Sequence, residues 1–222
     1  MELSEQELVR RESLQKMRDM GIDPYPAAEY EVTGYSTDIK GNFTDEVPGD
    51  EAIRLEAWYT GKPVRIAGRL MSRRIMGKAS FIEVQDSKGR IQVYVSRDDV
   101  QAPVPEGEVA TTVEQQMYNV VFKKLLDIGD FIGIEGFVFR TQMGEISVHA
   151  QKLTVLAKSL KPLPIVKYKD GVAYDGFTDP EQRYRQRYVD LVVNEGVKDV
   201  FLKRSTIVRP CVRCLTRQVT PR

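Results

Sequence analysis

The sequence predicts a mainly β fold with additional helices, and three observations lead to this prediction. Between residues 62 and 157, apolar residues alternate with polar ones, which is the period expected of strands that bury one face. Turn sequences such as Gly77-Lys78 and Asp86-Ser87-Lys88-Gly89 divide this alternation into short segments. One helical stripe, over residues 113–125, separates the third segment from the fourth. The expected order is therefore strand, strand, strand, helix, strand, strand.

The bounds of the five strands follow from the alternation and from the turn residues. The strands are expected over residues 64–75, 79–86, 90–96, 131–140 and 145–156. Gly68 is expected to mark a bend or a β-bulge, because a glycine inside a strand often does so. This element order is that of an OB-fold, a small Greek-key barrel whose outer sheet face binds oligonucleotides in many proteins. Such a barrel can also bind sugars or proteins, so the fold alone does not give the function.

Helices are expected on both sides of the barrel. Ser4 and Glu7 form a capping box that begins the first helix, and Gly21 is placed to end it. A short helix is also possible around residues 53–58. After the barrel, Asp179 suits the N-cap of a new helix and Pro180 its first position, and a second helix begins near residues 196–199. We therefore assign residues 1–61 to an N-terminal helical extension, 62–157 to the barrel, 158–176 to a linker and 177–222 to the incomplete start of a second domain.

The composition limits the classes of partner. The chain has 222 residues, of which 41% are hydrophobic and 29% charged, as in an ordinary soluble protein. It contains no apolar run of membrane-spanning length and begins without a signal-peptide core, so we expect a cytoplasmic protein with no membrane partner. The net charge is only +1, but residues 62–78 contain six basic side chains and no acidic one. Such a stripe suits a polyanionic partner, although it could also protect a sheet edge from aggregation.

The alternation of side chains also identifies candidate binding residues. In the second strand Ile82 and Val84 face inward, so Phe81 faces outward, and by the same count Gln92, Tyr94 and Glu145 lie on the outer face. Arg74 is close by at the end of the first strand, but the irregularity expected at Gly68 leaves its side undetermined. The candidate set therefore consists of the outward residues Phe81, Gln92, Tyr94 and Glu145, together with Arg74 close by.

The chemistry of this set suits single-stranded RNA. An aromatic ring can stack on a base, which contributes about 1–3 kcal/mol. Gln92 can donate to and accept from a base edge, Arg74 can pair with base oxygens or phosphate, and Glu145 can accept from a base imino or amino group. Stacking combined with such edge contacts is how proteins recognise RNA loops. The alternative is that Phe81 packs beneath a helix or beneath the N-terminal extension.

The sequence offers little support for a catalytic or metal site. Cys211 and Cys214 have the spacing of half a zinc site, but no second pair follows and His149 is the single histidine, so four ligands cannot be assembled. Gly61-Lys62-Pro63 lacks the upstream glycine and the following Ser or Thr of a phosphate-binding loop. We therefore expect no catalytic residue, metal or cofactor within this chain.

Several segments resemble bacterial class II lysyl-tRNA synthetases. The barrel segments are RRIMGKASFIEVQD (73–86), GRIQVYVSRDD (89–99) and TQMGEISVHAQKLTVLAKSLKPLP (141–164). RRESLQKMRDMGIDPYP (10–26) resembles the beginning of that family, and DPEQRYRQRYVDLVVN (179–194) resembles the entry to its catalytic domain. The resemblance covers about residues 4–209.

The resemblance implies a function for the parent enzyme and a role for each candidate. The parent enzyme joins lysine to tRNA(Lys) through a lysyl-adenylate, uses ATP and Mg²⁺, and forms a homodimer. Its OB-fold domain reads a UUU-type anticodon, with the central uracil stacked on the aromatic that corresponds to Phe81. The uracil edges would be contacted by Arg74, Gln92 and Glu145. From the basic stripe we add five expected contacts to the tRNA backbone: Lys62, Arg65, Arg69, Arg73 and Lys78.

The end of the chain departs from the family. From Pro210 onwards the sequence reads PCVRCLTRQVTPR, and a proline inside the helix expected there costs about 3 kcal/mol. We interpret the chain as a truncated or frame-shifted product without the motifs that bind ATP and lysine, which would bind tRNA but form no adenylate. Two alternatives are a stand-alone OB-fold module for single-stranded nucleic acid and an interaction protein whose outer barrel face binds another protein.

Overall fold

The structure is a computed structural model that describes residues 3–46, 57–102, 111–164, 167–169, 172–174, 176–194 and 196–219. The chain divides into two compact units, Met1–Pro162 and Leu163–Arg222. The division falls inside the segment for which the sequence predicts a linker. Each unit is described by itself.

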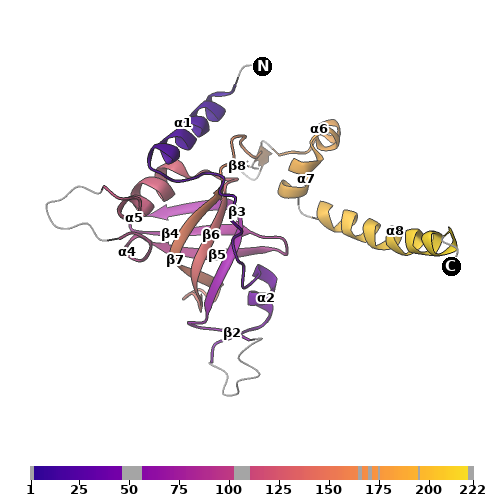
Figure 1. Ribbon diagram of the computed structural model, residues 1–222, viewed down its shortest axis with the longest axis horizontal. Coiled ribbons are helices and arrows are strands. Elements are labelled where there is room, and N and C mark those ends of the chain that lie inside the picture. Colours follow the sequence, from indigo (N-terminus) through magenta and orange to yellow (C-terminus); the bar gives the residue numbers. More distant parts are fainter. Residues whose placement is uncertain are drawn as a thin grey trace. The chain divides into compact units, whose positions relative to one another are not determined.

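Five strands of the first unit form a closed barrel (Figure 1). They are β3 (Pro63–Met76), β4 (Ala79–Gln85), β5 (Arg90–Ser96), β6 (Phe131–Arg140) and β7 (Ile146–Ala157). The order around the barrel is β3-β4-β5-β7-β6, and β3 pairs with β6 to close it. Only the β5–β7 pair is parallel among these five pairs. This is the OB-fold arrangement, so the predicted mainly β fold with a five-stranded barrel is confirmed.

The barrel core consists of the inward residues that alternation predicts. On β4 and β5 every second residue is buried, and the residues between them are partly exposed. The buried residues are Ser80, Ile82, Val84, Ile91, Val93 and Val95. Burial of these branched side chains gives each strand one apolar face, and this face fixes the pairing register.

The β-bulge of β3 lies at Met71 and not at Gly68, which corrects the bulge that the sequence suggested there as one of two possibilities. Leu70 pairs with Val84 and Ser72 with Glu83, so Met71 is the extra residue of a bulge. Gly68 pairs regularly with Ile132, and its lack of a side chain serves a different purpose. A Cβ atom there would lie 2.5 Å from the carbonyl oxygen of Gln85, so only glycine allows the two strands to approach this closely.

The helical connection between β5 and β6 differs from the predicted α-helix. After α4 (Arg97–Val100), α5 (Val113–Gln116) begins at an N-cap formed by Thr112 and continues into η1 (Met117–Leu125), which is π-helical. Tyr118 and Phe122 of η1 are fully buried, and their rings stack with centroids 5.4 Å apart. The hydroxyl groups of Tyr118 and Ser80 form a 2.8 Å hydrogen bond, which connects η1 to β4.

The N-terminal extension packs on the barrel. It comprises α1 (Glu5–Asp19), α2 (Ser36–Gly41) and the short parallel strands β1 (Phe43–Thr44) and β2 (Trp58–Tyr59). The capping box of Ser4 and Glu7 is present. Met17, Ile39 and Trp58 are buried in the same core as the barrel strands. Of the short helix expected around residues 53–58, residues 53–56 lie outside the described part, and Trp58 belongs to a strand.

A buried charged cluster joins the two ends of this unit. The Lys158 ammonium lies 2.8 Å from a carboxylate oxygen of Asp130, and both side chains are fully buried. On α1, the Arg10 guanidinium donates to the carbonyl oxygens of Ile128 and Ser159, at 2.9 and 3.0 Å. The beginning of the unit is thereby bonded to the segment that follows β7.

The second unit contains three helices and a two-stranded sheet in its described residues. The strands are β8 (Lys167–Lys169) and β9 (Val172–Tyr174), and the helices are α6 (Pro180–Arg185), α7 (Arg187–Val193) and α8 (Val197–Val219). As predicted, the Asp179 side chain caps α6 and Pro180 is its first residue. No helix in the described ranges is long and apolar enough to cross a membrane.

Ion pairs hold α6 and α7 together in this unit. The buried carboxylate of Asp190 accepts from the guanidinium groups of Arg183 and Arg187 and from the amide of Asn194. Burial alone would raise the pKa of Asp190, but the bonds from Asn194 and Arg183 outweigh it and lower that pKa. Tyr184 is largely exposed. Pro210 has no N–H to donate to the carbonyl of Thr206, so one helical hydrogen bond is lost there. The last helix nevertheless continues through this residue.

Candidate nucleic-acid interface

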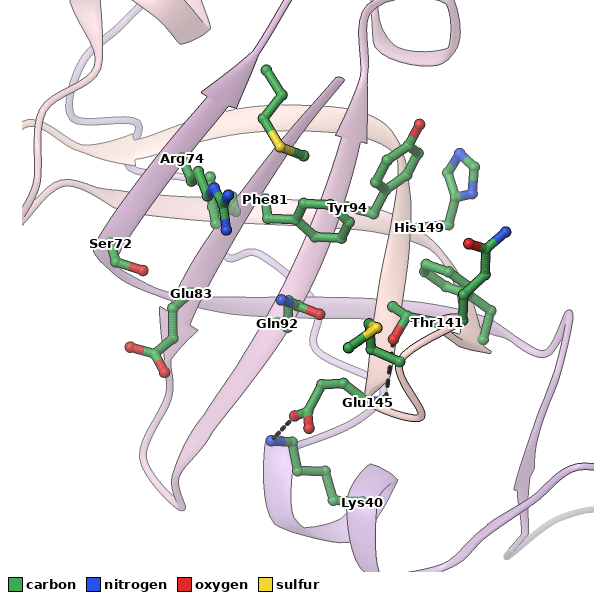
Figure 2. Close-up of a pocket in the computed structure, with 15 residues that line it drawn as sticks. Lys40, Ser72, Arg74, Phe81, Glu83, Gln92, Tyr94, Thr141, Glu145 and His149 are labelled. Carbon is green, nitrogen blue, oxygen red and sulfur yellow. Dashed lines mark hydrogen bonds and ion pairs between the residues drawn. The ribbon is translucent and has the colours of Figure 1, made fainter. Parts of the chain in front are cut away.

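A groove of about 940 Å³ lies on the outer face of the barrel. Its floor is formed by β3, β4 and β5, and the β6–β7 turn and α2 border it (Figure 2). The predicted base-contacting residues Arg74, Phe81, Gln92 and Glu145 all line this groove. The structure therefore brings together four residues that are spread over about seventy positions of the sequence.

Aromatic rings follow one another along the groove. The ring centroid of Phe81 lies 5.3 Å from that of Tyr94, and Tyr94 lies 4.9 Å from His149 and 6.2 Å from Phe139. Phe81 is partly buried in this row and lines the groove (Figure 2). The fold therefore does not cover Phe81 with a helix, which was the alternative that the sequence left open.

Arg74 stands directly opposite Phe81 in the register of β3 and β4. Because Met71 is the extra residue, Ser72, Arg74 and Met76 share the outer face with Phe81 and Glu83. Arg74 is exposed, and its guanidinium has no hydrogen-bond or ion-pair partner among the described residues. It is therefore a free cation beside an aromatic ring, which suits a base oxygen or a phosphate.

Gln92 and Glu145 already have partners. The Ser147 hydroxyl donates to Oε1 of Gln92 at 2.9 Å, which leaves the amide N–H groups of Gln92 directed away from that bond. The Lys40 ammonium lies 2.7 Å from Oε1 of Glu145 (Figure 2). Sequence reasoning missed Lys40, because α2 and the β6–β7 turn are 105 residues apart and no local pattern connects them.

His149 and Asp99 form a polar pair beside the aromatic row. Their Nε2 and Oδ2 atoms are 2.8 Å apart, and His149 is mostly covered. Burial alone would raise the pKa of Asp99, but hydrogen bonds from His149 and Ser96 outweigh it and lower that pKa. His149 lies beside Tyr94 in the register of β5 and β7, and its pairing with Asp99 could not be predicted from the sequence, because the two residues are 50 positions apart.

The cations predicted to contact the tRNA backbone have different surroundings. The Lys62 ammonium donates to the carbonyl of Ala57 at 2.6 Å and lies 4.6 Å from the Trp58 ring centroid. Arg65 forms ion pairs with Glu31 and Glu135, at 3.4 and 3.5 Å. Both side chains are therefore engaged within the first unit.

Arg69 and Arg73 donate to main-chain carbonyl groups at one end of the barrel. Arg69 bonds the carbonyl of Gly129 at 2.8 Å, and Arg73 bonds those of Phe122 and Leu126, the latter at 2.9 Å. Burial lowers the pKa of both guanidinium groups. Lys78 differs from the other four predicted cations, because it is exposed and its ammonium has no partner among the described residues.

The described parts of the chain contain no cluster of three or more His, Cys, Asp or Glu side chains that could hold a metal ion. Cys211 and Cys214 are free thiols on the exposed surface of α8. The groove itself offers an aromatic ring at Phe81, a cation at Arg74, an amide at Gln92 and a carboxylate at Glu145.

Comparison with known proteins identifies the class of this barrel. Residues 64–156 match the family described as OB-fold nucleic acid binding domain. These bounds coincide almost completely with the five strands, so the surface described above lies on the domain that this family model matches.

Comparison over nearly the whole chain finds relatives with a more specific name. A protein named lysine–tRNA ligase from Porphyromonas gingivalis W83 is 60% identical over 207 residues, which cover 93% of this chain and 32% of the relative. Proteins of the same name from Azobacteroides pseudotrichonymphae and Christiangramia forsetii are 56% and 52% identical, over 92% and 93% of this chain. The chain is thus homologous to lysine–tRNA ligases over nearly its whole length, and it spans about a third of the length of these relatives, which confirms the resemblance.

Proposed function

We propose that the groove recognises the anticodon loop of tRNA(Lys). The observation that carries this proposal is the convergence of Arg74, Phe81, Gln92 and Glu145 on one open groove of a nucleic-acid-binding barrel. Homologues of this chain are named lysine–tRNA ligase, so the RNA that suits the proposal is tRNA(Lys) with a UUU-type anticodon.

Each residue then has a role that its surroundings support. The ring of Phe81 stacks on the central uracil, and the neighbouring ring of Tyr94, tilted at 58° to it, packs beside it. Gln92 offers its amide N–H groups and Glu145 its free carboxylate oxygen to uracil edges, since uracil presents both carbonyl acceptors and an imino donor. Arg74 contacts a base oxygen or a phosphate.

Among the cations of the basic stripe, we propose Lys78 as a direct contact to the RNA backbone. The other four predicted cations already have partners within the first unit, so we propose that they contribute to RNA binding only through the positive potential that attracts the RNA. They are Lys62, Arg65, Arg69 and Arg73. Their charge remains within the first unit even though their donors are occupied.

For the whole protein we propose lysine–tRNA ligase activity, with ATP and Mg²⁺ used to form a lysyl-adenylate, a homodimeric state and a cytoplasmic location. The barrel supplies recognition, and residues 177–222 form the entry to the catalytic domain. The first unit thus selects the tRNA, and the chemistry belongs to parts of the enzyme that these 222 residues do not include.

The proposal is tested by titrating the full 222-residue chain with a tRNA(Lys) anticodon stem-loop and with a loop whose central uridine is replaced by cytidine. We expect the first loop to bind more tightly by about 1–3 kcal/mol. Phe81→Ala should remove most of this difference, whereas Tyr184→Ala, which removes an exposed ring from the second unit, should leave it unchanged. Equal affinity for the two loops would indicate a general single-strand module, and absence of binding to both would indicate a protein partner.

A further inference from the structure

The helix α2 is fixed to the barrel by several independent contacts. The Asp86 carboxylate, in the β4–β5 turn, accepts from the backbone N–H and the hydroxyl of Ser36, at 2.6 and 2.8 Å. The Lys88 ammonium, in the same turn, lies 2.6 Å from the carboxylate of Asp38. Ile39 is fully buried in the core. These contacts leave α2 little freedom. The side chain of Lys40, the next residue of this helix, therefore extends from a defined position.

From this position Lys40 reaches across the end of the groove to the β6–β7 turn. Its ammonium bonds Oε1 of Glu145 at 2.7 Å, while Oε2 has no partner among the described residues (Figure 2). The backbone N–H of Glu145 donates to the Thr141 hydroxyl at 3.1 Å, which fixes the main chain beneath the carboxylate. One carboxylate oxygen is therefore committed to Lys40 and the other is free to accept from a ligand.

A second contact from the same segment holds the same turn. Asp45, four residues after α2, forms a two-point ion pair with Arg140, with distances of 2.7 and 3.0 Å. Arg140 also donates to the carbonyl of Gly144 at 3.0 Å. Segment 36–45 thus forms ion pairs with both sides of the β6–β7 turn, at Glu145 and at Arg140.

We propose that segment 36–45, which lies outside the OB-fold barrel, is part of the base-recognition site and that Lys40 is the positioning residue for Glu145. This inference rests on the proposed function. Lys40 holds the carboxylate with Oε2 directed at the groove, where it accepts the imino or amino hydrogen of one base.

The positive charge of Lys40 also offsets the negative charge of Glu145 at the rim of the groove. An unpaired carboxylate at the rim of the groove would repel the phosphates on both sides of the base that it contacts, whereas the paired carboxylate carries a cation within 2.7 Å. Since both side chains are partly exposed, the pair contributes little to folding, and its effect should be found in recognition.

The experiment uses the full chain and four RNA stem-loops: the UUU loop and three loops in which one of the uridines is replaced by cytidine. Lys40→Met should weaken binding of the UUU loop by about three- to fivefold and should reduce discrimination at the one position where Glu145→Gln also reduces it. The double variant should discriminate no worse than Glu145→Gln alone, because Lys40 acts through Glu145. Lys40→Arg, which keeps the charge and the donor, should restore most of the discrimination.

Lys124→Met is the matched control, because it removes an exposed lysine of η1 that does not line the groove. It should weaken all four loops alike and by less than twofold. If Lys40→Met also weakens all four loops by one common factor, Lys40 supplies only charge and the inference is wrong. Tighter binding of the UUU loop by Lys40→Met would show that Lys40 competes with the RNA for the Glu145 carboxylate. This result would also contradict the inference. Absence of discrimination by the wild-type chain would instead overturn the proposed function.

Discussion

Arg73 and Lys78 carry the same charge five residues apart, yet their surroundings give them different tasks. Arg73 lies opposite inward-facing Ile82 and bonds two carbonyl groups at the end of η1, whereas Lys78 is exposed at the β3–β4 turn. A lysine or arginine count from the sequence cannot separate these cases, because the acceptors of Arg73 lie about fifty residues further along the chain.

This difference predicts opposite effects of two substitutions. Arg73→Met should lower the free energy of unfolding by about 1–3 kcal/mol, because two main-chain carbonyl groups lose a charged donor. Lys78→Met should leave that free energy within about 0.5 kcal/mol and should reduce the slope of log affinity against log salt concentration by about 0.7.

Urea unfolding measures the stability of both variants, and titration of the UUU stem-loop at several salt concentrations measures the slope. A stable Arg73→Met protein with a reduced salt slope would mean that Arg73 contacts the RNA directly, as the basic stripe first indicated.

Alternation along a strand is enough to place some of the proposed base-contacting residues on the outer face, but not all of them. Phe81 and Gln92 follow directly from buried neighbours on β4 and β5. Arg74 required knowledge of where the bulge lies, and Lys40 required knowledge of how α2 docks. Both depend on contacts between distant segments, which a local pattern does not contain.

At the scale of elements, β3 shows what the sequence can and cannot reveal. All five strands lie within two residues of their predicted ends, because turn residues and the period of two fix them together. The bulge was expected at the only glycine of the strand, but it occurs at Met71, where β3 changes from pairing mainly with β6 to pairing with β4 alone. Its position is set by how the strand wraps around the barrel.

Gly68 therefore has a packing role that a substitution can test. Gly68→Ala should lower the free energy of unfolding by about 1–3 kcal/mol, because the added Cβ would lie 2.5 Å from the carbonyl oxygen of Gln85 and 2.7 Å from a methyl group of Val84.

Gly41→Ala is the control for Gly68→Ala. A Cβ at Gly41 has no heavy atom within 4 Å, and this residue ends α2, so we expect a neutral or slightly stabilising effect. Thermal unfolding followed by circular dichroism compares the two variants. An equal loss in both would show that the close approach of β3 and β4 is not what requires glycine at position 68.

On the scale of the whole molecule, we predict that the second unit is not needed for RNA binding. All residues that line the groove belong to the first unit, Met1–Pro162. A variant that ends at Pro162 should bind the UUU stem-loop with an affinity within about twofold of the full chain, since both retain the same groove. Neither protein should support lysine-dependent ATP–pyrophosphate exchange. A large loss of affinity on truncation would place part of the RNA-binding surface in residues 163–222.

The bonds from Arg10 to the segment after β7 also determine the order in which the first unit can be completed. Arg10 is made early, but its acceptors at Ile128 and Ser159 are made more than a hundred residues later. During synthesis on a ribosome, α1 therefore leaves the exit tunnel first and yet can dock in its final place only after the whole barrel has followed. The bond from Arg10 to Ser159 can therefore form only after β7, the last strand of the barrel, has been made, and it marks the completion of the first unit.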